Sequence, residues 1–82
     1  MAHSLQELVE HIARSLVDYP NAVEVREVTG PGDATVFELR VAKDDLGKVI
    51  GKGGATARAI RFVLIAAAMK TRKRVVLNIV ED

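Results

Sequence analysis

The chain has 82 residues, no cysteine and a formal net charge of +1. This length suits one small domain, and the absence of thiols excludes a disulfide framework or a zinc site built on cysteine. No apolar run approaches the roughly 20 residues that a transmembrane helix needs, and no basic segment followed by an apolar stretch opens the chain, so a cytoplasmic protein is expected.

Charge is distributed unevenly along the chain. Residues 1–45 hold nine acidic side chains, whereas residues 46–80 hold eight basic side chains and no acidic one. Such an asymmetry indicates contact with nucleic acid. The basic group at residues 70–74 is equally consistent with an ordinary solvated surface, because it lies at the other end of the longest predicted helix from the glycine motif described below.

A first amphipathic helix is predicted over Leu5–Val17. Ser4 and Glu7 have the spacing of a capping box, in which the two side chains satisfy free backbone N–H groups. Apolar residues then recur at helical spacing, and Pro20 prevents the helix from continuing. These apolar residues are Leu5, Leu8, Val9, Ile12 and Leu16.

Two strands are expected next, over residues 23–28 and 35–42. The second strand alternates apolar and polar side chains, as in Val36-Phe37-Glu38-Leu39-Arg40-Val41. The connecting residues 29–34 contain Gly-Pro-Gly-Asp, which is a strong turn signal. The two strands are therefore predicted to be antiparallel neighbours.

Two helices and a third strand complete the chain. A short helix is predicted over residues 43–50, begun by Asp44 or Asp45, followed by a long helix over residues 55–71 and a strand over residues 75–80. The two helices form a crossover long enough for the second and third strands to be parallel. We therefore expect an α+β fold of order α-β-β-α-α-β, with a three-stranded mixed sheet covered on one face by helices.

The stretch Gly51-Lys52-Gly53-Gly54 lies between the two later helices. Glycine permits a tight turn and close approach of a ligand to the backbone, and the helix that follows offers unpaired N–H groups to an anion. A Walker loop would need Ser or Thr where Gly53 follows Lys52, and a dinucleotide fingerprint would need glycine in place of Thr56. The motif therefore predicts a clamp for backbone phosphates, although a plain helix–helix turn also uses glycine.

The segment Val49-Ile50-Gly51-Lys52-Gly53-Gly54 resembles the Val-Ile-Gly-x-x-Gly signature of KH domains. In those domains the loop between two helices clamps about four nucleotides of a single strand. Together with the element order, the chain resembles a type II KH domain, and in particular the KhpA family of single-domain bacterial KH proteins. The resemblance implies one KH domain over residues 1–82, with its core and glycine loop in residues 35–80.

This resemblance implies an RNA-binding protein, an RNA chaperone or post-transcriptional regulator linked to cell division and elongation. The implied partners are single-stranded RNA and either a second copy of the chain or a larger KH protein of the KhpB (Jag or EloR) type. No cofactor, small-molecule substrate or membrane contact is implied. The residues expected to contact RNA are Lys48, Val49, Ile50, Gly51, Lys52, Gly53, Gly54, Arg58 and Arg61.

Within this set, Lys52 is expected to neutralise a phosphate, and Val49 and Ile50 are expected to form the floor of a groove for bases. Arg58 and Arg61 are equally consistent with solubilising surface residues. Many KH domains carry isoleucine where this chain has Ala57, so the groove is expected to be shallower than usual.

The longest helix carries two apolar stripes on nearly opposite sides. One stripe is Ile60, Val63, Leu64, Ala67 and Ala68, and the other is Phe62, Ile65, Ala66 and Met69. One stripe is enough to pack on the sheet, so either the first helix or a second protein covers the other. If a second protein does, the expected anchors of a dimer interface are Phe62, Ile65 and Met69, with Ile60 as the next choice.

No catalytic constellation is visible in the sequence. There is no cysteine nucleophile, and neither His3 nor His11 lies beside an evident acid or metal-binding cluster. An enzyme and a metal site are therefore not expected. Two functions remain: an RNA-binding module, which the intact glycine loop favours, and a protein-interaction or dimerisation domain with little RNA affinity.

Overall fold

The computed structural model describes residues 4–81, in which the helices and strands follow one another in the expected order. The elements are α1 (Leu5–Leu16), β1 (Glu24–Thr29), β2 (Thr35–Arg40), α2 (Leu46–Ile50), α3 (Ala55–Ala68) and β3 (Val75–Ile79), joined by short 3-10 turns. The expected α-β-β-α-α-β fold is therefore confirmed. No helix in this part of the chain is long and apolar enough to cross a membrane.

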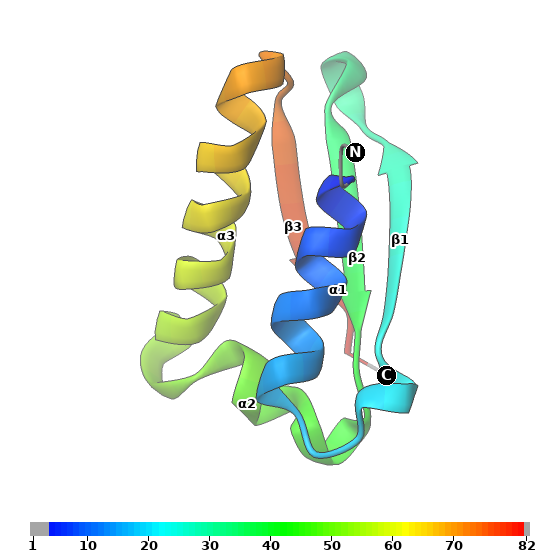
Figure 1. The fold of residues 1–82 in the computed structure, drawn as a ribbon, viewed down its shortest axis with the longest axis vertical. Coiled ribbons are helices and arrows are strands. Elements are labelled where there is room, and N and C mark those ends of the chain that lie inside the picture. The colour runs from blue at the N-terminus through cyan, green and yellow to red at the C-terminus, as the bar shows by residue number, and fades with distance from the viewer. Residues whose placement is uncertain (1–3, 82) are drawn as a thin grey trace.

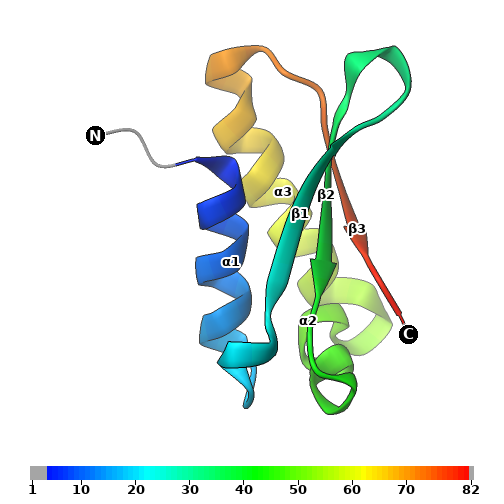
Figure 2. The same cartoon turned by 90° about the vertical axis from the view of Figure 1, so that its right-hand side faces the viewer.

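The sheet has the strand order β1-β2-β3, with β2 in the centre as expected. β1 and β2 pair antiparallel, with Val25 opposite Leu39, because the turn between them reverses the chain. β2 and β3 pair parallel, with Phe37 opposite Leu77, because the crossover through α2 and α3 returns the chain to its starting end. The helices lie on one face of this mixed sheet, and the other face is left uncovered (Figures 1 and 2).

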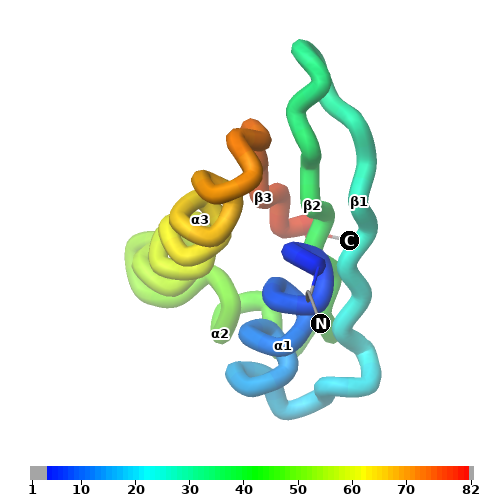
Figure 3. The backbone as a smooth tube through the Cα atoms, turned by 45° about the horizontal axis from the view of Figure 1, so that its top comes forward, coloured from blue at the N-terminus to red at the C-terminus, as the bar shows by residue number. Residues whose placement is uncertain are grey.

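The hydrophobic core lies between the covered face of the sheet and the helices, which form a second layer in Figure 3. Phe37, Leu39 and Leu64 are its largest fully buried apolar side chains. Burying one such side chain contributes about 1.5–3 kcal/mol to folding. The other core residues are Val9, Ala13, Val23, Val25, Val41, Val49, Ile60 and Leu77.

The ends of the two long helices follow from local sequence. At α1 the predicted capping box is present: the Glu7 backbone N–H donates to Ser4 Oγ at 3.1 Å, and the Ser4 N–H donates to Glu7 Oε1 at 3.3 Å. At α3 the α-helical hydrogen bonding ends at Ala68. One 3-10 turn then extends to Thr71, where the prediction ended the helix, and Arg72 follows with a positive φ of 56°.

The predicted start of the short helix needs a correction. Residues 43–45 form a 3-10 turn, and α2 begins only at Leu46. Asp45 precedes α2 as its N-cap residue, as predicted, but its side chain makes no capping hydrogen bond. The Asp45 side chain is instead fully buried. It binds a different segment of the chain, because a buried carboxylate requires several hydrogen-bond donors.

Candidate nucleic-acid interface

The glycine loop, Gly51–Gly54, joins α2 to the lower end of α3 in Figure 1. Gly51 has φ 75° and ψ 171°, a conformation that essentially only glycine adopts. A Cβ atom at this position would also lie 2.8 Å from the backbone nitrogen of Thr56. At Gly53, where φ is 62°, nothing lies within 4 Å of the corresponding position. The loop is therefore tight where it leaves α2 and open at Gly53, where a ligand can approach the backbone.

Two arginines of α3 contact backbone carbonyls near this loop. Arg58 Nη1 donates to the Gly53 carbonyl at 2.7 Å, which helps to hold the loop in place. Arg61 Nη2 donates to the Leu77 carbonyl at 3.4 Å and so links α3 to the edge strand β3. A guanidinium has five N–H donors, so each arginine keeps donors for an anion after making one such bond.

Lys48, on α2, pairs with the chain segment that follows α1. Its Nζ lies 3.1 Å from Asp18 Oδ2 and 3.5 Å from Asp45 Oδ1. Hydrogen bonding and charge attraction from Asp18, with a further contribution from Asp45, raise the pKa of Lys48 above its ordinary value despite partial burial. The ammonium group of Lys48 is thus paired with two carboxylates, and a phosphate would have to compete with them; its RNA contact stays a prediction.

Asp45 is the centre of this small network. Its Oδ1 accepts from the Asp18 N–H at 3.1 Å, and its Oδ2 accepts from the Tyr19 N–H at 2.9 Å. Burial alone would raise the pKa of Asp45, but the two N–H groups and Lys48 outweigh it and lower the pKa below the ordinary value. Asp45 thus fastens the segment after α1 to the start of α2, the helix that presents the glycine loop.

The remaining residues expected at the interface differ in exposure. Val49 is fully buried in the core, so the expectation that it forms the floor of a base groove is wrong. Ile50 is half-buried, and Lys52 is exposed within the loop. The structure therefore places the glycine loop, Ile50 and Lys52 beside the start of α3, which carries the two arginines, and it removes Val49 from this surface.

The second apolar stripe of α3 is left largely uncovered. The exposed fractions are 73% for Phe62, 45% for Ile65 and 71% for Met69, so α1 does not cover this face. Ile60 is only 3% exposed, because it packs in the core beside Leu64. Ile60 is therefore excluded as an anchor for a second protein, whereas the other three expected anchors are accessible.

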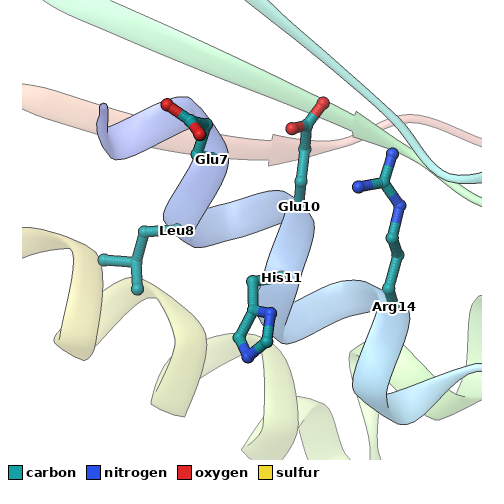
Figure 4. Close-up of a pocket in the computed structure, with 5 residues that line it drawn as sticks. All are labelled: Glu7, Leu8, Glu10, His11 and Arg14. Carbon is teal, nitrogen blue, oxygen red and sulfur yellow. The ribbon is translucent and has the colours of Figure 1, made fainter. Parts of the chain in front are cut away.

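A concavity follows the outer side of α1 and is lined by Glu7, Leu8, Glu10, His11 and Arg14. In Figure 4, Leu8 and His11 extend from one side of α1, and Glu10 and Arg14 extend from the other side. Residues 4–81 contain no group of three side chains that could hold a metal ion, and His3 lies outside this range. The concavity has charges of both signs and no converging ligand set, so it is a weaker site for an anion than the glycine loop.

Comparison with known proteins gives a consistent result. Residues 6–79 match the family model of the KhpA/KhpB KH domain. The chain is 54% identical to the RNA-binding protein KhpA of Clostridium acetobutylicum, over 93% of this chain and all of that protein. It is 42% identical to the RNA-binding protein KhpA of Chlamydia pneumoniae, over 95% of this chain and 99% of that protein.

One solved structure has the same fold. It is Era of Aquifex aeolicus bound to GDP and AlF4-, which matches with a TM-score of 0.65 over 92% of this chain and 29% of that chain. The sequence identity is 19%, so this likeness concerns the arrangement of helices and strands alone.

Proposed function

Because the chain belongs to the KhpA/KhpB family of KH domains, we propose that it is an RNA-binding protein whose glycine loop holds the phosphate backbone of single-stranded RNA. The observation that carries the proposal is the geometry of the loop. Its backbone is open at Gly53, Lys52 is exposed beside it, and α3 begins directly after it. Residues 46–80 contain no carboxylate side chain that would repel a phosphate.

The contacts suggest a separate role for each part of this surface. Lys52 neutralises a phosphate, and the backbone around Gly53 approaches the sugar-phosphate chain closely. Arg58 holds the loop through the Gly53 carbonyl and adds positive charge. Arg61, bound to the Leu77 carbonyl, places a further cation between α3 and the edge strand. Ile50 is the apolar side chain that remains available to a base, which agrees with a shallow groove.

We further propose that the uncovered face of α3 mediates association with a second copy of the chain or with a KhpB-type protein. Phe62, Ile65 and Met69 are large, apolar and accessible, as the anchors of an interface must be. Two associated copies would present two glycine loops to one RNA, which would increase avidity without new contacts. This face is also the observation that favours the alternative function, a protein-interaction domain with little RNA affinity.

The family resemblance extends the proposal to the cell. A protein of this kind would act on RNA in the cytoplasm, as a chaperone or post-transcriptional regulator connected with cell division and elongation. It would act by binding rather than by catalysis.

The double substitution Lys52→Asp with Gly53→Asp tests the RNA site. It places two negative charges beside the phosphate, so binding of an RNA of about four nucleotides should be abolished. For the wild type, the slope of log affinity against log salt should be about −0.7 for each phosphate contacted.

A matched control is available away from the glycine loop. Gly32, in the connection between β1 and β2, also has a positive φ, of 67°, with nothing within 4 Å of its Cβ position, and Arg26 is exposed on the edge strand β1. Gly32→Asp with Arg26→Asp therefore repeats the backbone strain and the charge change away from the loop. Unchanged RNA affinity in a folded Lys52/Gly53 variant, or equal loss in this control, would contradict the proposed site.

A further inference from the structure

We propose that the basic turn, defined as Lys70, Arg72, Lys73 and Arg74, is a second site for RNA phosphates. The turn lies at the opposite end of α3 from the glycine loop (Figure 1). The inference rests on the proposed RNA binding and extends it to strands longer than the loop alone can hold.

The charge of the basic turn is not neutralised within the chain. All four side chains are exposed, and none forms an ion pair with any of residues 4–81. The connection between β1 and β2 is fixed beside the turn, because the Thr35 N–H donates to the Arg74 carbonyl at 2.9 Å. That connection carries one carboxylate, Asp33, which is exposed and likewise has no pairing with the turn. The turn therefore presents concentrated positive charge.

The conformation of Arg72 sets this turn apart from an ordinary helix end. Arg72 has φ 56° and ψ 27°, a left-handed conformation that usually calls for glycine just after a helix. Cations near the C-terminus of a helix interact favourably with its dipole, and this interaction explains why some basic residues follow α3. It does not explain why an arginine occupies the left-handed position. A charged residue kept in an unfavourable backbone conformation points to a role in binding.

The surface between the two sites is compatible with a continuous strand of RNA. α3 has 14 residues, so the glycine loop and the basic turn lie about 21 Å apart along its axis. Arg61 lies between them on the side of α3 that contacts β3, outside the face that carries Phe62, Ile65 and Met69, and residues 46–80 contain no acidic side chain. The nearest acid beyond β3 is Glu81, at the end of the strand that runs back toward the glycine loop.

These dimensions set the length of RNA that would contact both sites. A stacked strand advances about 3.4 Å per nucleotide, so about six nucleotides cover the distance beyond the glycine loop. The loop itself holds about four. An RNA of about four nucleotides should therefore contact the loop only, whereas one of about twelve should reach the basic turn.

The substitution Arg72→Gly separates binding from stability. Glycine relieves the left-handed strain, so the thermal midpoint of unfolding should be unchanged or raised. One cation is lost, so the log–log salt slope for the twelve-nucleotide RNA should become less negative by about 0.7, with no change for the four-nucleotide RNA. Lys70→Gln with Lys73→Gln removes two cations, so the slope for the longer RNA should become less negative by about 1.4. Oligouridines of the two lengths are suitable probes.

The control is Arg14→Gln with Lys43→Gln, which removes two exposed cations from other parts of the surface. If the salt slope for the twelve-nucleotide RNA changes as much in this control as in the Lys70/Lys73 variant, the effect is one of net charge, and the second site is overturned. Unchanged slopes for the longer RNA, while the four-nucleotide RNA still binds the loop, would also overturn the second site and leave the proposed function standing. If wild-type protein binds neither RNA, the proposed RNA function fails, and the second site fails with it.

Discussion

Two regions of this molecule depart from the usual division between an apolar interior and a polar surface, in opposite ways. The uncovered face of α3, which carries Phe62, Ile65 and Met69, is apolar and exposed, and Phe62 and Met69 are each more than two-thirds accessible. At the start of α2, the carboxylate of Asp45 is charged and fully buried. One region places large apolar side chains in solvent, and the other places an anion in the protein interior.

The difference lies in where each region finds its partners. Asp45 is satisfied inside the chain, by the N–H groups of Asp18 and Tyr19 and by Lys48. The uncovered face of α3 has no such partner among residues 4–81, and we have proposed that another molecule covers it. If so, the first region concerns folding and the second concerns association, and substitutions should affect different measurements in the two cases.

The largest effect on folding is expected for Asp45→Ala. The substitution removes the acceptor for two backbone N–H groups and for the ammonium group of Lys48, and buried donors without acceptors are costly. Its thermal midpoint, measured by circular dichroism, should fall further than that of any single substitution on the uncovered face of α3. Asp44→Ala, at the exposed neighbouring position, is the control and should leave the midpoint nearly unchanged. A wild-type midpoint for Asp45→Ala would refute the structural role.

Phe62→Asp should weaken association of the chain with itself while leaving the stability of the monomer nearly unchanged. A charge in the centre of an apolar interface typically costs 2 kcal/mol or more, so the dimer dissociation constant should rise by about 30-fold or more. The free energy of unfolding of the monomer should change by no more than about 0.5 kcal/mol, because the side chain is exposed. Ile65→Asp should act similarly, and Ser15→Asp on the exposed side of α1 should have neither effect.

Light scattering or sedimentation over a concentration series provides the measurement. If the wild type remains monomeric at high concentration, association with itself is excluded and only a different KH protein remains as the partner. If Phe62→Asp and Ile65→Asp associate as strongly as the wild type, this face of α3 is not the interface.

Local signals were sufficient to predict the order and pairing of the elements. The capping box, the Gly-Pro-Gly-Asp turn and the glycine loop each depend on residues close together in the chain. Strand order then follows from the lengths of the connections. The glycine loop could be assigned for the same reason, since its unusual backbone requires glycine at Gly51.

Long-range contacts explain what the sequence could not predict. Asp45 contacts backbone groups 26 and 27 positions away, and no local pattern reveals that pairing. α2 has five residues, too few for its periodicity to show that Val49 points inward and that Lys48 turns toward Asp18. The two stripes of α3 are similarly apolar, so only packing against the sheet and α1 identifies the buried one.

Ala57→Ile should destabilise the fold, whereas the same change on the exposed face of α3 should not. Ala57 is 8% exposed and lies on the buried face with Ile60, so three additional carbons must fit into packed space. Overpacking of this kind usually costs about 1–3 kcal/mol of unfolding free energy, measurable by chemical denaturation. Ala59→Ile on the exposed face is the control, expected within about 0.5 kcal/mol of the wild type. A stabilised Ala57→Ile variant would instead indicate that the chain leaves space beside Ile60 for the isoleucine common in other KH domains.

The smallest effect should be a dependence of stability on acidic pH. Because the pKa of Asp45 is lower in the folded chain than its ordinary value of 3.8, its ionised form stabilises the fold fully above that pH. The contribution is lost as the pH falls from 3.8 through the folded-state pKa. The pKa of Lys48 is raised above 10.5, so its contribution is complete below that pH and is lost only in stronger base. The network should therefore give a constant contribution between about pH 4 and pH 10.

Asp45→Asn isolates this dependence, because asparagine has a similar shape and does not ionise. Other carboxylates titrate in both proteins, so the informative quantity is the difference between the two unfolding free energies at each pH. That difference should be constant near neutral pH and should shrink as the pH falls below 3.8, where Asp45 of the unfolded wild-type chain takes up a proton that the folded chain does not yet bind. A difference that stays constant through pH 3.8 would show that folding does not lower the pKa of Asp45. A difference that grows as the pH falls toward 3.8 would show that folding raises this pKa, so that the folded chain holds Asp45 neutral. Its buried position would then depend on hydrogen bonding without charge.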